Sequence, residues 1–376
     1  LECHRATLVL MTPPSILLWM RSSPLRVLAL VVALGFVATA CGDSTDDDPL
    51  LSGSPPAPEE PESTATTAEP TTTTAVASPD GPSPAEPGEY AVGRRTVPLT
   101  DQDRAGRTLT VDLWYPADEA AAAAAPKSVY SFIPGVEFTS EVAAADVPVA
   151  DGGPYPLALY SHGSSGQRFV ASGNAELLAS HGFVVAAPDH TGNTAFDAFL
   201  NTTEPQDQIA VDRPTDAEFV ITELLAQSAA TDTPLSGVID PERIGIYGHS
   251  FGGYTALMAA SEEGGGRDER IVAVVAQAPA TGLISDEGLE SITIPTLLLS
   301  GTRDRTTPVA QNTERPWELI SGRPLIRVDI IDGGHQSFTD VCDYQAVSYT
   351  HLRAHETNDL ISYAVFCLKR GGGGGG

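Results

Sequence analysis

The chain has 376 residues, with 49 acidic side chains against 21 basic ones, and its formal net charge is −28. A chain this acidic, without a basic cluster, argues against nucleic acids and anionic lipids as partners, because like charges repel. Residues 43–88 contain ten prolines and ten Asp or Glu but no Lys, Arg or aromatic residue, so they cannot bury enough apolar surface to fold. We therefore expect a disordered Pro/Thr/Glu-rich linker over residues 42–88 and one folded domain over residues 89–345.

The N-terminal residues are typical of an export signal. A positively charged start at Met20, an apolar run over residues 27–37 and small residues before Cys41 have the order of such a signal. Residues 20–41 therefore predict a lipoprotein-type signal peptide in which Cys41 is lipidated, with residues 1–19 as upstream overrun of the reading frame. A plain secretory signal with an incidental Cys41 is the alternative. In both cases the protein is exported, as a cell-envelope lipoprotein or a secreted protein, and it meets a membrane only through a lipid on Cys41.

Short apolar segments alternate with helical ones through the folded domain. Residues 90–100 and 108–115 predict an antiparallel pair of strands at the edge of a sheet, and residues 117–154 predict an irregular crossing segment. Further strands are expected at 155–160, 183–188, 244–247, 271–278, 295–300 and 325–331, and helices at 168–180, 212–229 and 255–260. Alternation of this kind indicates an α/β protein with a mostly parallel twisted sheet of about eight strands and helices on both faces.

The stretch from Gly248 to Gly252 lies between a buried strand and a helix of small residues. Its sequence, Gly-His-Ser-Phe-Gly, is the G-x-S-x-G pattern, in which the glycines let the backbone turn sharply and lift a serine hydroxyl above the sheet edge. Ser250 is therefore the candidate nucleophile. The alternative is a glycine-rich turn with an idle serine.

A serine nucleophile needs a histidine base, and the base needs a carboxylate that holds it in the right tautomer. Elimination among the eight histidines leaves His335, which follows the last predicted strand and completes the chain order Ser, Asp, His. For the carboxylate we choose Asp304, in a polar loop after a buried strand. Asp329 and Asp332 are its rivals, but both are too close in sequence to His335 to approach its ring easily from behind.

Two backbone N–H groups are expected to bind the negative oxygen of a tetrahedral intermediate. One belongs to Phe251, which follows the nucleophile, and the other to Ser164, in the loop after the third predicted strand. For the second, the alternative is that His162 and Gly163 merely make a turn. Each such donor is typically worth about 3 kcal/mol of barrier.

Several of these motifs together resemble one group of enzymes. They are Trp114-Tyr-Pro116, Tyr160-Ser-His-Gly163, residues 181–190, residues 248–253 and Gly334-His335. The combination resembles the α/β-hydrolase group that includes platelet-activating-factor acetylhydrolases and dienelactone-hydrolase-like esterases, over roughly residues 90–340. The resemblance implies an α/β-hydrolase fold and a calcium-independent serine carboxylesterase for short or oxidised acyl esters, with polyester hydrolases as neighbours in fold.

The C-terminal residues depart from this group. Residues 346–376 resemble the in-frame translation of a sequencing-library adapter that ends in six glycines, and a genuine helical tail is the alternative. With this segment set aside, the final helix that the group has after its histidine is expected to be missing. Cys342 is then the one cysteine in the folded part, and it has either lost a disulfide partner or is free.

We expect a serine carboxylic-ester hydrolase that acts on a small-molecule ester through an acyl-enzyme intermediate. The sequence has no zinc-ligand spacing, dinucleotide fingerprint or phosphate loop, so neither a cofactor nor a metal is expected. Three alternatives stay open: a polyester hydrolase of the same fold, a serine peptidase of the prolyl-oligopeptidase type, and a non-catalytic binding protein on a hydrolase scaffold. Comparing the turnover of esters with that of peptides distinguishes a serine peptidase from an esterase. Failure to label with a fluorophosphonate would indicate the binding protein.

Overall fold

The computed structural model describes residues 85–133, 136–265 and 267–340. The chain divides into two units, Leu1–Gly81 and Pro82–Gly376, and the described residues belong to the second. The predicted signal peptide with Cys41, nearly all of the linker, Cys342 and the adapter-like segment lie outside them. In the described part of the chain, none of the helices combines the length and the apolar character that a membrane span requires.

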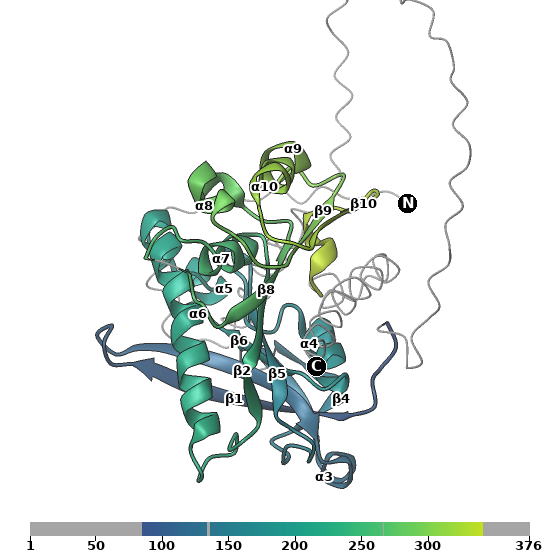
Figure 1. The fold of residues 1–376 in the computed structure, drawn as a ribbon. Helices are drawn as coiled ribbons and strands as arrows, with labels where there is room; N and C mark the ends of the chain where they lie inside the picture. Colours follow the sequence, from purple (N-terminus) through teal and green to yellow (C-terminus); the bar gives the residue numbers. More distant parts are fainter. Residues whose placement is uncertain (1–84, 134–135, 266, 341–376) are drawn as a thin grey trace, which may run out of the picture. The chain divides into compact units, whose positions relative to one another are not determined.

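A ten-stranded sheet runs through the described residues, with the strand order β10-β9-β8-β7-β5-β6-β2-β1-β4-β3 (Figure 1). The strands are β1 Ala91–Asp101, β2 Arg107–Ala117, β3 Lys127–Ile133, β4 Val136–Ala145, β5 Tyr155–Ser161, β6 Val184–Pro188, β7 Ile239–His249, β8 Ile271–Gln277, β9 Thr296–Gly301 and β10 Leu325–Ile330. Neighbours from β10 through to β6 are parallel, whereas β2 pairs antiparallel with both β6 and β1. This confirms the predicted mostly parallel sheet.

Two of the strands lie in the segment that the sequence predicted to be irregular. β3 and β4 pair antiparallel, and β4 also pairs parallel with β1. The expectation of about eight strands was therefore too low, and β1 and β2 are not at the edge of the sheet. β4 escaped prediction because it ends in three alanines, which favour strands weakly; β3, its antiparallel partner, directly precedes it, and β1, its parallel partner, is distant in the sequence.

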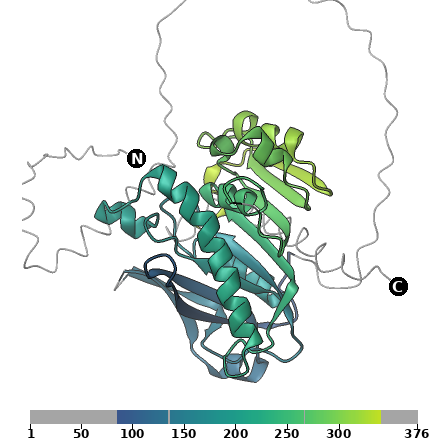
Figure 2. The ribbon, with the colours of Figure 1, turned by 60° about the vertical axis from the view of Figure 1, so that its left-hand side comes forward.

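Helices cover both faces of this sheet. They are α3 Glu119–Ala124, α4 Ser172–Ser180, α5 Ala195–Leu200, α6 Gln206–Ala229, α7 Phe251–Ala259, α8 Asp286–Glu290, α9 Val309–Asn312 and α10 Glu314–Leu319, with short 3-10 turns η1 Thr281–Leu283 and η2 His335–Phe338. One buried apolar cluster joins α6 and α7 to the sheet, and a second joins α4 and η2 to its other face. Figure 2 shows α6 lying across the first face.

α6 begins at Gln206, six residues before the predicted start, and continues through Pro214. A proline inside a helix has no N–H to donate to the carbonyl four residues earlier, which here is that of Ala210. The hydroxyl of Tyr254 donates to the Ala210 oxygen at 3.1 Å instead. A side chain of α7 thus satisfies the backbone group that the proline leaves unpaired, and this ties α6 to α7.

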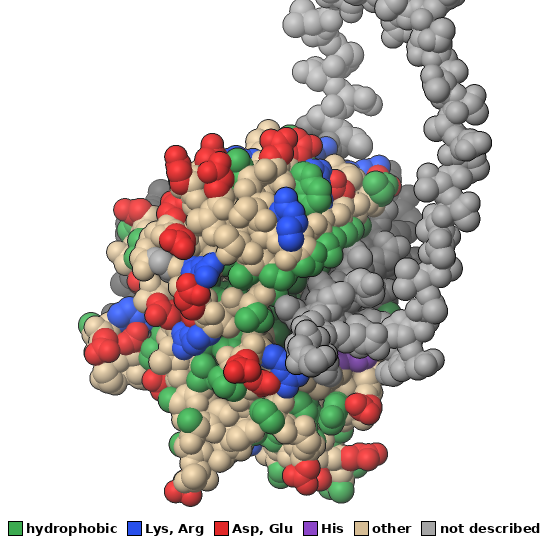
Figure 3. All heavy atoms as spheres, in the orientation of Figure 1, with side chains coloured by type: hydrophobic (Ala, Val, Ile, Leu, Met, Phe, Trp, Pro, Cys, Tyr) green, Lys and Arg blue, Asp and Glu red, His purple; other side chains and the backbone are tan. Residues whose placement is uncertain are grey.

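The face of the sheet that carries α4 also has a small hollow. An apolar hollow lies over β5, β7 and β8, and its lining includes Ala158, Phe183, Tyr247 and Val275. On the side of the molecule drawn in Figure 3, apolar side chains gather towards the middle and acidic ones are scattered around them.

The predicted absence of a final helix concerns residues after 340, which are not among those described, and it stays a prediction.

Candidate active site

Ser250 lies at the tight turn between β7 and α7. Its backbone angles, φ 58° and ψ −116°, are in the left-handed half of conformational space, which costs a non-glycine residue about 1–3 kcal/mol. Glycine is required at position 252, because a Cβ there would collide with the carbonyl oxygen of Ser161. The N–H of Ser250 donates to the Gln277 oxygen of β8 at 2.8 Å, which fixes the turn to the sheet. The strained turn that G-x-S-x-G predicts is therefore present.

The structure brings the three predicted side chains together at the ends of neighbouring strands. Nε2 of His335, in η2 after β10, lies 2.9 Å from Oγ of Ser250, and its Nδ1 lies 2.7 Å from Oδ2 of Asp304, after β9. A carboxylate only accepts hydrogen bonds, so Nδ1 carries the proton and Nε2 presents its lone pair to the serine hydroxyl. This is the arrangement that a histidine needs to take a proton from serine.

Asp304 is held as a charged group. Its Oδ1 accepts the backbone N–H groups of Thr306 and Thr307 at 2.8 and 2.9 Å, and its Oδ2 also accepts the Thr307 hydroxyl at 2.8 Å. Burial by itself would raise the pKa of Asp304, but the hydrogen bonds from His335 and Thr307 outweigh burial and lower that pKa to about 2. The carboxylate is thus ionised at neutral pH and can stabilise a positive charge on His335.

The two rival carboxylates are engaged elsewhere. Asp329 accepts the hydroxyl of Ser300 at 2.5 Å and pairs with Arg327 at 2.7 Å, whereas Asp332 pairs with Arg303 at 2.9 Å. The sequence argument that preferred Asp304 over both agrees with this geometry.

The two predicted oxyanion donors belong to two different segments, the start of α7 and the loop after β5. Phe251 is the first residue of α7, where backbone N–H groups have no acceptor within the helix. Ser164 is exposed in the β5 loop, which we define as residues 162–166. That loop touches the nucleophile, because a Cβ built on Gly163 would lie 3.4 Å from the Cβ of Ser250. Both segments that carry the predicted donors thus lie near Ser250.

His249, the residue between glycine and serine in the elbow, is a site residue that sequence reasoning missed. Its side chain is buried, and its Nε2 lies 2.8 Å from the backbone oxygen of His335. Burial, and then the neighbouring His335, lower the pKa of His249 to about 3, so the ring is neutral at ordinary pH. Its place inside the motif gave no sign that it reaches the histidine loop.

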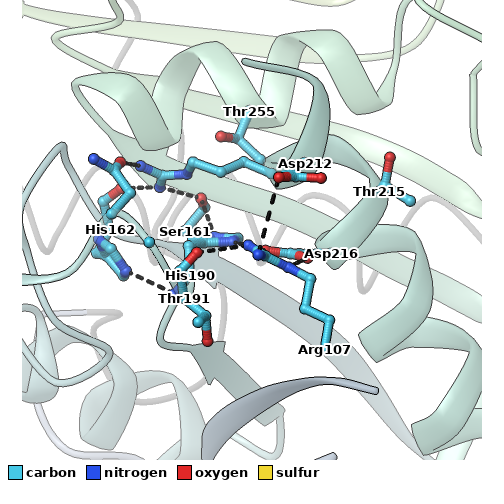
Figure 4. Close-up of polar contacts among 12 residues, drawn as sticks. Arg107, Ser161, His162, His190, Thr191, Asp212, Thr215, Asp216 and Thr255 are labelled. Atoms are coloured by element: carbon cyan, nitrogen blue, oxygen red, sulfur yellow. Dashed lines mark hydrogen bonds and ion pairs between the residues drawn. The ribbon is translucent and has the colours of Figure 1, made fainter. Parts of the chain in front are cut away.

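A second buried cluster lies beside the site and was also missed. Oγ of Ser161 is 3.0 Å from Nε2 of His190, and Nδ1 of His190 is 2.9 Å from Oδ2 of Asp216, as Figure 4 shows. All three residues are at most 1% exposed, so substrate cannot reach them. Asp216 also pairs with Arg107 at 2.8 Å. A signal existed, because Arg213 and Asp216 occupy the same face of α6 as its apolar core residues.

In residues 85–133, 136–265 and 267–340, no group of three or more His, Cys, Asp or Glu side chains is arranged to hold a metal ion.

Known proteins match both the sequence and the fold. A family model described as PET hydrolase-like matches residues 172–349. Platelet-activating factor acetylhydrolase of Cavia porcellus is 24% identical over 226 residues, which is 51% of this chain and 50% of that protein. Cutinase est1 of Thermobifida alba is 28% identical over 218 residues, which is 57% of this chain and 60% of that protein. This chain thus spans about half to three fifths of the length of these relatives.

A solved structure of a ferulic acid esterase from Streptomyces cinnamoneus superposes with a TM-score of 0.56, at 23% identity, over 73% of this chain and 89% of that one. The sheet and the elbow are those of the α/β-hydrolase fold. Together with the sequence matches, this fold makes the chain similar to the α/β-hydrolase esterase group that includes platelet-activating factor acetylhydrolase and cutinase. The resemblance read from the motifs is confirmed at this level.

Proposed function

We propose that the protein is a serine carboxylic-ester hydrolase that works through an acyl-enzyme intermediate. The observation that carries the proposal is the unbroken line of hydrogen bonds from Asp304 through His335 to Ser250. The similarity to relatives named as an acetylhydrolase and a cutinase supports it.

The proposed reaction has two halves. Oγ of Ser250 attacks the ester carbonyl carbon while Nε2 of His335 takes the hydroxyl proton, and Asp304 stabilises the imidazolium. The tetrahedral oxyanion is bound by the N–H groups of Phe251 and Ser164. When it collapses, the C–O bond to the alcohol breaks and His335 protonates the departing oxygen. Water then attacks the acyl-enzyme with the same base, which releases the carboxylic acid and restores Ser250.

The substrate that we propose is a small ester with a short or oxidised acyl chain. The matches to platelet-activating factor acetylhydrolases favour this class. A second candidate is a polyester, since the matching family model is PET hydrolase-like and one relative is named a cutinase. Chain-length profiles with p-nitrophenyl esters from acetate to laurate, together with acid release from polyester film, distinguish the two classes.

We further propose that the protein is exported and anchored through a lipid on Cys41. The order of charged, apolar and small residues before Cys41 supports this. Expression with labelled palmitate should label the wild type and leave Cys41→Ala unlabelled, with the variant moving from the membrane fraction to the medium. A wild type that takes up no label would favour a plain secretory signal.

The decisive experiment compares Ser250→Ala with Ser236→Ala, a matched change at an exposed serine away from the site. We expect Ser250→Ala to abolish p-nitrophenyl butyrate turnover and fluorophosphonate labelling while its circular dichroism spectrum and Tm stay those of the wild type. Ser236→Ala should remain active and labelled. Residual turnover by Ser250→Ala would refute the assignment. A wild type that prefers peptides would indicate a serine peptidase, and one that does not label would indicate a binding protein.

A further inference from the structure

The side chain of Arg213 binds the β5 loop from the interior of the protein. This residue projects from α6 and is fully buried. Its Nη2 donates to Oγ of Ser161 at 2.9 Å and, in a short bond, to the backbone oxygen of His162, while its Nη1 donates to Oδ1 of Asn193 at 2.9 Å. The acceptors of these bonds are neutral groups, and although the charge of the nearby Asp216 favours the charged guanidinium, burial outweighs it and lowers the pKa of Arg213 to about 9. Burying this charge is therefore costly even with Asp216 nearby, and the bonds that it makes point to a role in holding the β5 loop.

Arg213 reaches both sides of the site. Its guanidinium carbon lies 5.2 Å from the ring centroid of Phe251, the first residue of α7. Through Asn193, whose Nδ2 lies 3.2 Å from Oγ of Ser164, it is also linked to the exposed end of the β5 loop. One buried guanidinium therefore contacts or supports both residues whose N–H groups are the proposed oxyanion donors.

The side chain of His162 fixes the direction of the Ser164 N–H by binding the neighbouring carbonyl group. Its Nε2 accepts the backbone N–H of His190 at 3.1 Å, so Nδ1 carries the proton and donates to the Gly163 oxygen at 2.7 Å. The same oxygen accepts the N–H of Gly166 at 3.0 Å. In a planar trans peptide the N–H points opposite to the C=O, so two bonds on the Gly163 carbonyl fix the direction of the Ser164 N–H.

The protons of the remaining cluster are fixed in the same way. Nδ1 of His190 faces the carboxylate of Asp216 and must carry a proton, which leaves Nε2 to accept the hydroxyl proton of Ser161. The Ser161 oxygen is then free to accept from Arg213, as observed. Burial and the charge of Arg213 lower the pKa of His190 to about 4, in agreement with a neutral ring. Figure 4 shows Ser161 and His190 lying between His162 and Asp216.

We propose that Arg213 is a positioning residue of the oxyanion hole, which keeps the β5 loop in the shape that presents the Ser164 N–H beside Ser250. The inference rests on the proposed function. It adds a residue that touches neither the substrate nor the reacting atoms. Because a misplaced donor matters most where negative charge develops, the loss should fall on the transition state rather than on substrate binding.

The test uses Arg213→Gln and Arg213→Lys in the full-length protein, with active sites counted by fluorophosphonate titration. For each variant, kcat and KM with p-nitrophenyl butyrate are compared with the inhibition constant of an alkyl trifluoromethyl ketone, whose hemiketal places an oxyanion in the hole. For Arg213→Gln we expect kcat per active site to fall about 10- to 100-fold at nearly constant KM, and ketone affinity to fall in parallel. Arg213→Lys keeps the positive charge but lacks the planar guanidinium. Its kcat and ketone affinity should therefore lie between those of the wild type and those of Arg213→Gln.

The matched control is Arg104→Lys. Arg104 pairs with Asp216 at 2.7 Å, on the side of the cluster away from the β5 loop, so its replacement perturbs the same carboxylate without touching the loop. We expect a lower Tm with unchanged kcat per site and unchanged ketone affinity. Should Arg213→Gln not fold, Asn193→Ala breaks the link to Ser164 while Arg213 stays in place, and a smaller parallel loss of kcat and ketone affinity is expected.

Three results would overturn the inference. They are a folded Arg213→Gln protein with wild-type kcat and ketone affinity, a loss in KM alone, and an equal loss of kcat in Arg104→Lys. These are distinct from failure of the proposed function, which would appear as a wild type that neither hydrolyses esters nor labels. In that case both the esterase proposal and the role of Arg213 are refuted. If the wild type is active and the Arg213 variants have wild-type kcat and ketone affinity, only the role of Arg213 is refuted.

Discussion

Nε2 of His249 lies 2.8 Å from the backbone oxygen of His335, so the residue that precedes the candidate nucleophile holds the loop of the candidate base. The two rings are also in contact, with centroids 4.6 Å apart. Because the carbonyl oxygen is an acceptor, Nε2 of His249 must carry a proton. The elbow thus fixes both partners of the proposed proton transfer, Ser250 through its strained backbone and His335 through this bond.

Replacing His249 by Phe should reduce both stability and activity. The change keeps an aromatic ring but leaves the oxygen of His335 without its donor, which costs about 1–3 kcal/mol. The free loop should also lower kcat about 10-fold, because the base no longer stays in line with Ser250. Urea unfolding and p-nitrophenyl butyrate kinetics measure the two effects. His249→Gln, which retains an N–H donor, is the control and should recover part of each, whereas equal losses in both variants would contradict this role of the bond.

Buried neutral histidines should make the protein less stable as the pH falls below about 6.5. Burial lowers the pKa of His249 to about 3 and that of His190 to about 4, and it also lowers the pKa of His162. Between these values and the ordinary pKa of about 6.5, the unfolded chain binds protons that the folded chain does not. Stability is therefore full above pH 6.5 and decreases towards acid by about 1.4 kcal/mol per pH unit for each such histidine.

The measurement is the free energy of unfolding in urea between pH 5 and pH 8. His249→Gln removes one titrating group, so its slope between pH 6 and pH 5 should be smaller than that of the wild type by about 1.4 kcal/mol per pH unit. Equal slopes in the two proteins would show that His249 is not held neutral. Asp304 acts in a lower window, since its folded pKa of about 2 is depressed and its contribution is lost only as the pH falls through the range below 4.

Asp304→Asn should cut kcat by about 10³- to 10⁴-fold with little change in fold. An amide can keep its oxygen on the N–H groups of Thr306 and Thr307, but its nitrogen then faces Nδ1 of His335. The imidazole must shift its proton to Nε2, which can no longer accept the hydroxyl proton of Ser250. Asp329→Asn is the matched control, because Asp329 was the rival carboxylate, and it should remain active. The reverse pattern of activities would transfer the role to Asp329.

The sequence predicted the parts of the molecule that depend on local spacing. Glycines on both sides of Ser250 and the order of strands before Asp304 and His335 are visible in one dimension, and the structure brings these side chains together. Their catalytic roles stay predictions. β4 was missed because its alanine-rich end depends on pairing across the sheet, whereas the Val, Tyr, Phe and Ile of β3 do favour a strand and were obscured by the alanine- and proline-rich composition of residues 117–154. The place of Arg213 on the apolar face of α6 was visible in the sequence, but the groups that it contacts in the β5 loop are distant in the sequence and could not be predicted.

Tyr254 and Pro214 should be coupled in stability. The Tyr254 hydroxyl satisfies the Ala210 oxygen only because Pro214 has no N–H to give. Tyr254→Phe should therefore cost about 1–3 kcal/mol of unfolding free energy, with kcat unchanged, since the hydroxyl points away from Ser250 to α6. In a Pro214→Ala background the new N–H restores the helical bond, and the same change should cost about 1 kcal/mol less. A double-mutant cycle in urea measures this difference, and strictly additive effects would mean that the hydroxyl does not replace the missing N–H.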